Sequence, residues 1–121
     1  MRLALILALS ASLACASGSY ALDAQQRTAH LRAAYPPGKM TRAQARSRLG
    51  SEPEVSSSQP ASGWTDALVL DVVRTTGLSV ALAEEYVLPD ATSFYPTLSR
   101  VWFFWGHDGV LVDVRWGHMS D

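Results

Sequence analysis

The feature that most constrains the fold is a pair of apolar runs near the C-terminus with a short turn sequence between them. Aromatic and β-branched residues fill positions 101–105 and 110–116, and the intervening turn contains Asp108 and Gly109. Asp-Gly between two such runs is typical of a β-hairpin, because glycine adopts the positive φ of a tight turn. The first run is apolar on both faces, which predicts a central strand covered by a helix. The second run alternates, which predicts a half-exposed last strand.

Two short helices are predicted ahead of this hairpin. The first spans 23–35 and stops at 36–38, where two prolines and a glycine cannot continue a helix. The second helix begins after Thr41, a good N-cap, and Gln44 three residues later completes a capping box. It ends before Gly50, which suits the left-handed residue at a helix exit.

The middle of the chain is less clearly patterned. Residues 51–63 are polar and loop-forming, with room for one short edge strand near Val55. Thr65 and Gly77 would frame a helix, but the β-branched composition of 67–88 favours strands, and we expect strands there. Together these elements predict an α+β fold with two short N-terminal helices packed on a small antiparallel β-sheet that ends in a β-hairpin.

The first 21 residues have the features of a secretory signal peptide. Arg2 supplies the positive charge, residues 3–9 form an apolar run, and small residues follow. Cleavage is expected near 14–16 or at Ala21. The remaining residues, 22–121, suffice for one small domain. The sequence therefore predicts an exported protein.

Cys15 is the only cysteine of the chain, so the folded domain contains no disulfide. It stands where a lipoprotein signal places its acylated residue, which makes it a candidate for lipidation. Ala14 fits the usual lipobox, whereas Ser12 occupies the position of its leucine. A lipidated protein and a soluble one both remain open from the sequence.

Charge is unevenly divided along the chain. The formal net charge of -1 predicts no nucleic-acid partner. Residues 23–50 carry six basic side chains and one acidic, whereas 51–121 carry three basic and ten acidic. The basic stretch is either a solvated helix face or a surface for an anionic lipid membrane or an envelope protein partner. Arg42 and Arg46, four residues apart on one helix face, are the candidate contacts.

No motif in the sequence points to catalysis, a cofactor or a metal. Histidines 30, 107 and 118 lack partners at metal-ligand spacing, and no G-x-S-x-G motif occurs. Glu84 and Glu85 are adjacent on a predicted strand and therefore point to opposite faces. We expect a non-catalytic binding module. The alternative is a small periplasmic enzyme or ligand-binding protein with a cleft formed by residues 54–99.

Residues 38–53, Gly-Lys-Met-Thr-Arg-Ala-Gln-Ala-Arg-Ser-Arg-Leu-Gly-Ser-Glu-Pro, resemble the G-M-T-x-x-x-V-x-x-x-L-G-x-P signature of the SmpA/OmlA family. These are the BamE-like small outer-membrane lipoproteins of Gram-negative bacteria, and the C-terminal hairpin resembles their closing hairpin. Lys39 and Glu52 are extra residues, and Ala45 replaces the valine. The resemblance implies two short helices on a three-stranded antiparallel sheet, and a scaffold role in outer-membrane assembly or envelope integrity. It also implies that the exported protein is periplasmic or associated with the outer membrane.

Overall fold

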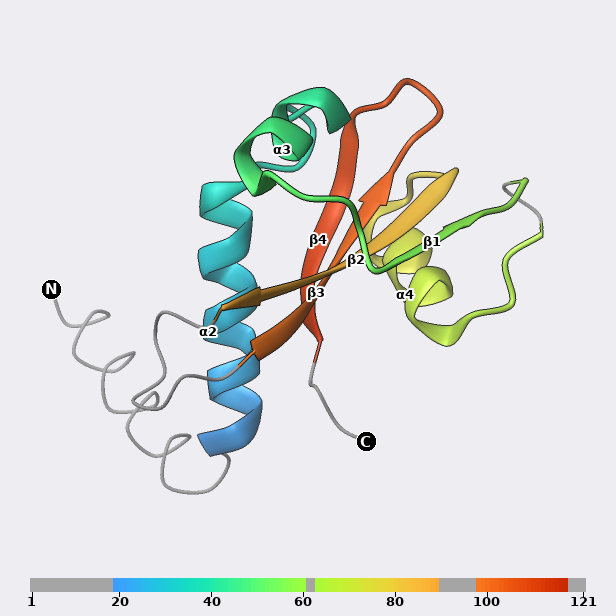
Figure 1. Cartoon of the computed structure of the whole chain (residues 1–121). Helices are drawn as coiled ribbons and strands as arrows, with labels where there is room; N and C mark the ends of the chain where they lie inside the picture. The colour runs from blue at the N-terminus through green and yellow to red at the C-terminus, as the bar shows by residue number, and fades with distance from the viewer. Residues whose placement is uncertain (1–18, 61–62, 90–97, 118–121) are drawn as a thin grey trace, which may run out of the picture.

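The computed structural model describes residues 19–60, 63–89 and 98–117, and it confirms the α+β class (Figure 1). It contains three helices in this part of the chain, where two were expected. The elements are α2 (Ser19–Ala34), α3 (Arg42–Leu49), β1 (Val55–Ser58), α4 (Ala67–Thr76), β2 (Leu82–Pro89), β3 (Leu98–Trp105) and β4 (Leu111–Gly117).

The four strands form one antiparallel sheet in the order β1-β2-β3-β4, one strand more than the resemblance implies. The predicted hairpin is confirmed as β3 and β4, and Gly109 in its turn has a φ of 75°. The short edge strand expected near Val55 is confirmed as β1. The central position predicted for 101–105 is also confirmed, because β3 has a neighbour on each side.

Both predicted helices are present. The first starts at Ser19, four residues before the expected Asp23. The capping box of α3 is complete: Thr41 Oγ1 accepts a hydrogen bond from the Gln44 amide at 3.2 Å, and Gln44 Oε1 accepts one from the Thr41 amide at 3.0 Å. Gly50 ends the helix in the left-handed conformation, with a φ of 73°.

The strand prediction for 67–88 is wrong in its first half and right in its second. Residues 67–76 form α4, and β2 begins at Leu82. Asp66 starts the helix, because its carboxylate accepts hydrogen bonds from the amides of the next turn. Val69 and Val72, three residues apart, face the sheet, so the apolar run serves a helical face and not a strand.

Helices cover both faces of the sheet, and each face has its own hydrophobic core (Figure 1). The first core lies under α2 and α3 and is built from Met40, Ala45, Tyr86, Val101, Phe103, Trp105, Leu111 and Val114. The second core includes α4 and is built from Trp64, Val69, Val72, Val80, Ala83, Phe104 and Val112.

Two expectations about the last strands are corrected. Strand β4 is not half exposed, because residues 111–114 are all buried. A register irregularity between Phe104 and Trp105 interrupts the alternation, so Val112 lies in the second core whereas Val114, two residues further on, lies in the first. The sequence also predicts that Trp102, Phe104 and Val112 are buried by the helix at 41–49 or the helix before it. Phe104 and Val112 are buried, but against α4, and Trp102 is only partly buried.

Candidate functional site

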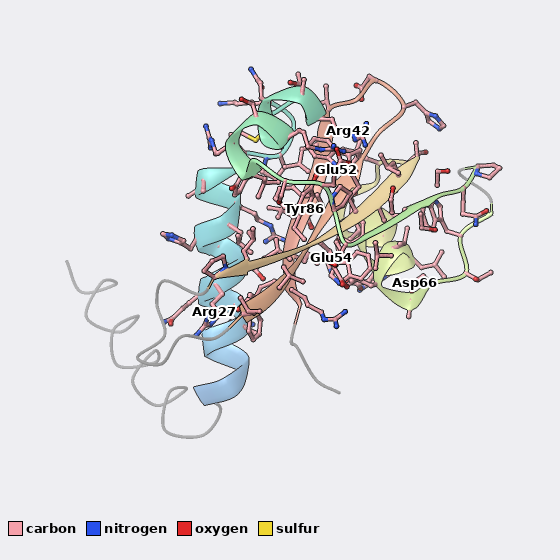
Figure 2. The ribbon with its side chains drawn as sticks, viewed as in Figure 1. Arg27, Arg42, Glu52, Glu54, Asp66 and Tyr86 are labelled. Atoms are coloured by element: carbon pink, nitrogen blue, oxygen red, sulfur yellow. The ribbon has the colours of Figure 1, made fainter. Side chains whose placement is uncertain are left out.

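The candidate contact residues Arg42 and Arg46 come together over a single buried carboxylate. Both project from one face of α3 to Glu84 of strand β2, which lies between β1 and β3. Figure 2 labels Arg42 below α3. The Glu84 side chain is 0% exposed, whereas that of Arg42 is 44% exposed. The two arginines therefore do not simply extend into solvent, as the sequence suggested, but tie α3 to the sheet.

The pairing engages both oxygens of Glu84. Arg42 donates from Nε to Oε1 at 3.0 Å and from Nη2 to Oε2 at 2.9 Å, the two-pronged geometry that guanidinium and carboxylate favour. Arg46 Nη2 adds a contact of 3.4 Å to Oε2, and its Nη1 lies 2.7 Å from Glu52 Oε1. Arg46 thus bridges the buried Glu84 and the exposed Glu52.

These contacts shift the pKa of two groups at this site, Arg42 and Tyr86. The hydrogen bond with Glu84 raises the pKa of the Arg42 guanidinium, so its positive charge is secured. Tyr86, on the same face of β2, is buried, and burial followed by the charge of Glu84 raises the pKa of its hydroxyl. Because arginines engage both oxygens of Glu84, we call this arrangement of Arg42, Arg46 and Glu84 the α3 clamp.

A second clamp holds α2 and α4 to the edge strand β4. Asp113 is buried there and accepts from Arg32 of α2, with Nε to Oδ1 at 2.8 Å and Nη2 to Oδ2 at 3.0 Å. Arg115 Nε lies 3.1 Å from Asp113 Oδ2, and the same guanidinium pairs with Asp71 of α4. Arg74 also pairs with Asp71. The network therefore links two helices through one strand.

This second clamp predicts a pH dependence of stability. Hydrogen bonds from Arg115 and Arg74 hold the pKa of the Asp71 carboxyl below its ordinary value of 3.8. Such a group stabilises the fold above its unfolded-state pKa, and this contribution is lost as the pH falls through the folded-state pKa. We expect the difference in unfolding free energy between the native chain and Asp71→Asn to be constant above about pH 5 and to shrink at lower pH. Urea unfolding at several pH values measures it, and an unchanged difference at the acid end would contradict the assignment.

The prediction that Glu84 and Glu85 point to opposite faces is confirmed. Glu84 meets α3, whereas Glu85 pairs with Arg100 Nη1 of the neighbouring strand at 2.8 Å on the other face. Sequence reasoning missed Glu84 and Asp113 as the partners of the helical arginines. The excess of basic residues in 23–50 and of acidic residues in 51–121 was the sequence signal that could have suggested these ion pairs.

The remaining singled-out residues are dispersed. His30 and His107 are exposed on α2 and in the hairpin turn, and His118 and Cys15 lie outside the described residues. Across residues 19–60, 63–89 and 98–117, no group of three or more His, Cys, Asp or Glu is arranged to hold a metal ion. No helix within these ranges is long and apolar enough to cross a membrane.

The segment expected to form a cleft, 54–99, supplies β1, α4 and β2 in its described part. Its apolar side chains, among them Val72, Val80 and Ala83, pack with Phe104 in the second core. Strands β1 and β2 therefore form part of the sheet, and α4 packs on one face of it.

The sequence was compared with protein-family models, with curated proteins and with solved structures, and none of the three comparisons gave a match.

Proposed function

We propose that this chain is an exported cell-envelope protein that acts as a non-catalytic scaffold or binding module in outer-membrane assembly or envelope integrity. The observation that carries the proposal is that the buried ionisable side chains are engaged in ion pairs. Glu84, Glu85 and Asp113 are buried, and each is paired with at least one arginine. Groups engaged in this way stabilise the fold and are not free for acid–base or nucleophilic chemistry. The leader sequence supports export.

The binding surface in this proposal surrounds α3 and is called the α3 surface. Its cations are Lys39, Arg42, Arg46 and Arg48, and the carboxylates that pair with them are Glu84 and Glu52. Four cations against two carboxylates leave an excess of positive charge, which favours an acidic partner. Arg42 and Arg46 contribute to this positive charge although both are paired with Glu84. Reversing their charge would place carboxylates against Glu84 and would test folding, not binding.

Site-specific photocrosslinking in the cells that produce the protein tests the proposal. Benzoylphenylalanine replaces Ser47, which is exposed on α3, and in a matched control it replaces Leu78, which is exposed beyond α4. We expect the chain in the envelope fraction, and protein adducts from position 47 but not from 78. Lys39→Glu, at an exposed residue of the α3 surface, should reduce the adduct several-fold, because it removes the excess positive charge.

Retention of the chain in the cytosol would overturn the export part of the proposal. Equal adducts at 47 and 78, or adducts insensitive to Lys39→Glu, would overturn the α3 surface as the binding site.

A further inference from the structure

The two edges of the sheet differ in what lies beside them. At one edge α2 packs along β4, and the Trp116 amide of β4 donates to Thr28 Oγ1 of α2 at 3.3 Å (Figure 1). At the other edge β1 pairs with β2 on one side, and no strand in the described part of the chain pairs with its other side. Ser56 and Ser58 of β1 are exposed. The edge of β1 is therefore open.

The open edge of β1 has unused backbone hydrogen-bonding groups. The Gln59 amide donates to Ala81 O at 3.4 Å, and these two residues continue the register of β1 and β2. Hydrogen-bonded and non-hydrogen-bonded pairs alternate along an antiparallel ladder, so Ser57 also directs its backbone groups to β2. The N–H and C=O groups of Ser56 and Ser58 then point away from β2. These two donors and two acceptors are available to an added strand.

The sequence of β1 permits such pairing. Its residues are Val-Ser-Ser-Ser, which include no lysine, no other charged residue and no proline that would block an edge. Prolines at positions 53 and 60 flank the strand and limit the open stretch to a few residues. The edge therefore suits one short segment of an extended chain.

The α3 side of this edge indicates the charge of the added segment. Ser56 is paired with Glu84, and paired residues place their side chains on the same face, so Ser56 is on the face that α3 covers. Arg46 spans this region, because its Nη2 lies 3.4 Å from Glu84 Oε2 and its Nη1 lies 2.7 Å from Glu52 Oε1. Its buried Nε has no hydrogen-bond partner among the described residues. A residue added opposite Ser56 would have its Cβ about 5 Å from that of Ser56, so Arg46 is the cation that its carboxylate would meet.

Glu52 occupies this position at Arg46 in the free protein. Its side chain is 83% exposed, and an ion pair with so exposed a carboxylate contributes little to stability. Figure 2 shows Glu52 near Arg42 and Tyr86 on the α3 side, and Glu54 farther from α3. A carboxylate from a partner can therefore replace Glu52 at small cost, and the excess positive charge of the α3 surface favours it.

We propose that an extended, acidic segment of a protein partner adds to the open edge of β1 as a fifth strand, and that its carboxylate opposite Ser56 replaces Glu52 at Arg46. This inference rests on the proposed binding function and specifies the conformation and charge of the partner segment. Backbone hydrogen bonds to Ser56 and Ser58 provide affinity, and Arg46 provides selection for an acidic side chain. A second copy of β1 fits less well, because its serines offer no carboxylate to Arg46.

The test uses the isotope-labelled full chain and a blocked peptide, Thr-Val-Glu-Val-Thr, at millimolar concentration. Thr-Val-Gln-Val-Thr is the matched uncharged peptide. With the acidic peptide, NMR should show that the amides of Ser56 and Ser58 exchange with solvent at least about tenfold more slowly, because both gain hydrogen bonds. The exchange of Ser79, an exposed residue before β2, should not change. The uncharged peptide should bind several-fold more weakly, since it has no charge for Arg46.

Three variants separate the backbone contribution from the charge contribution. Ser56→Pro removes an outward N–H but no hydrogen bond to β2, so it should abolish binding of both peptides. Ser56→Ala keeps this N–H and should bind both peptides normally. Glu52→Gln frees Arg46, and it should strengthen binding of the acidic peptide several-fold without affecting the uncharged one. Circular dichroism confirms that the variants are folded, and the Glu52→Gln result does not depend on the proline variant.

Exchange at Ser56 and Ser58 that neither peptide slows, or equal binding of the two peptides, would overturn the proposal. Slow exchange without peptide that becomes slower at higher protein concentration would assign the edge to a second copy and would also overturn it. These outcomes are independent of the cellular experiment. A chain that binds the acidic peptide at β1 but stays in the cytosol keeps the edge site and loses the proposed function. A chain that gives protein adducts from position 47 in cells but does not bind the peptide does the reverse.

Discussion

Replacing Phe104 with alanine is expected to lower the free energy of unfolding by about 3–5 kcal/mol. Phe104 is 0% exposed in the second core, where Val72 and Val80 are also fully buried. The ring of Trp102 stacks on it at a centroid separation of 6.5 Å. Neighbours from a helix, a loop and two strands cannot all move inward, so the substitution leaves a cavity in addition to the lost burial. Chemical denaturation of both proteins measures the loss.

The matched control for this core is Leu70→Ala. Leu70 lies on the outer side of α4 and is 47% exposed, so the same truncation there should change stability by less than about 0.5 kcal/mol. A small loss for Phe104→Ala, similar to the control, would mean that α4 does not pack on the sheet.

Local signals predicted the elements whose boundaries are set locally. The capping box of Thr41 and Gln44, the glycine exit at Gly50 and the Asp-Gly turn each depend on residues within one turn of one another, and the structure has all three. Such signals need no knowledge of the rest of the fold. This is why the helix at 42–49 and the closing hairpin could be predicted with their boundaries nearly correct.

The error at 67–76 has a different origin. A short apolar run fits a buried strand or a buried helix equally well by periodicity, and only the surroundings decide. Here α2 and α3 cover only one face of β2, β3 and β4. The other face requires a second cover, and α4 provides it. Asp66 was the overlooked signal, since its carboxylate caps the helix that Thr65 was considered to start.

The charge division along the chain also has a tertiary explanation. The sequence offered a solvated helix face or a surface for an external anion, and both readings placed the arginines in solvent. In the structure Arg32 of α2 and Arg42 and Arg46 of α3 find counter-ions inside the protein, on strands β2 and β4. Which acidic residue meets which arginine depends on strand register and helix docking. Neither can be obtained from spacing along the sequence.

A double-mutant cycle between Arg42 and Glu84 measures how much this ion pair of the α3 clamp contributes to the free energy of unfolding. Arg42→Met alone should cost about 2 kcal/mol, because it leaves a buried carboxylate with only the longer contact from Arg46. The partial exposure of Arg42 and the remaining arginine keep this below the full cost of an uncompensated buried charge. In a Glu84→Met background the same change should cost less than about 0.5 kcal/mol, since no buried charge remains.

Arg74→Met is the control for this cycle. Arg74 is also helical and also ion-paired, but its side chain is 73% exposed, so its removal should cost less than about 0.5 kcal/mol whether or not Glu84 is present. Urea unfolding of the variants gives the coupling energies. A cost for Arg42→Met that is the same with and without Glu84 would show that the pair does not hold α3 to the sheet. Arg42 would then be a surface cation that is free to bind a ligand, and it would belong to the binding surface and not to the ion pair that holds α3 on the sheet.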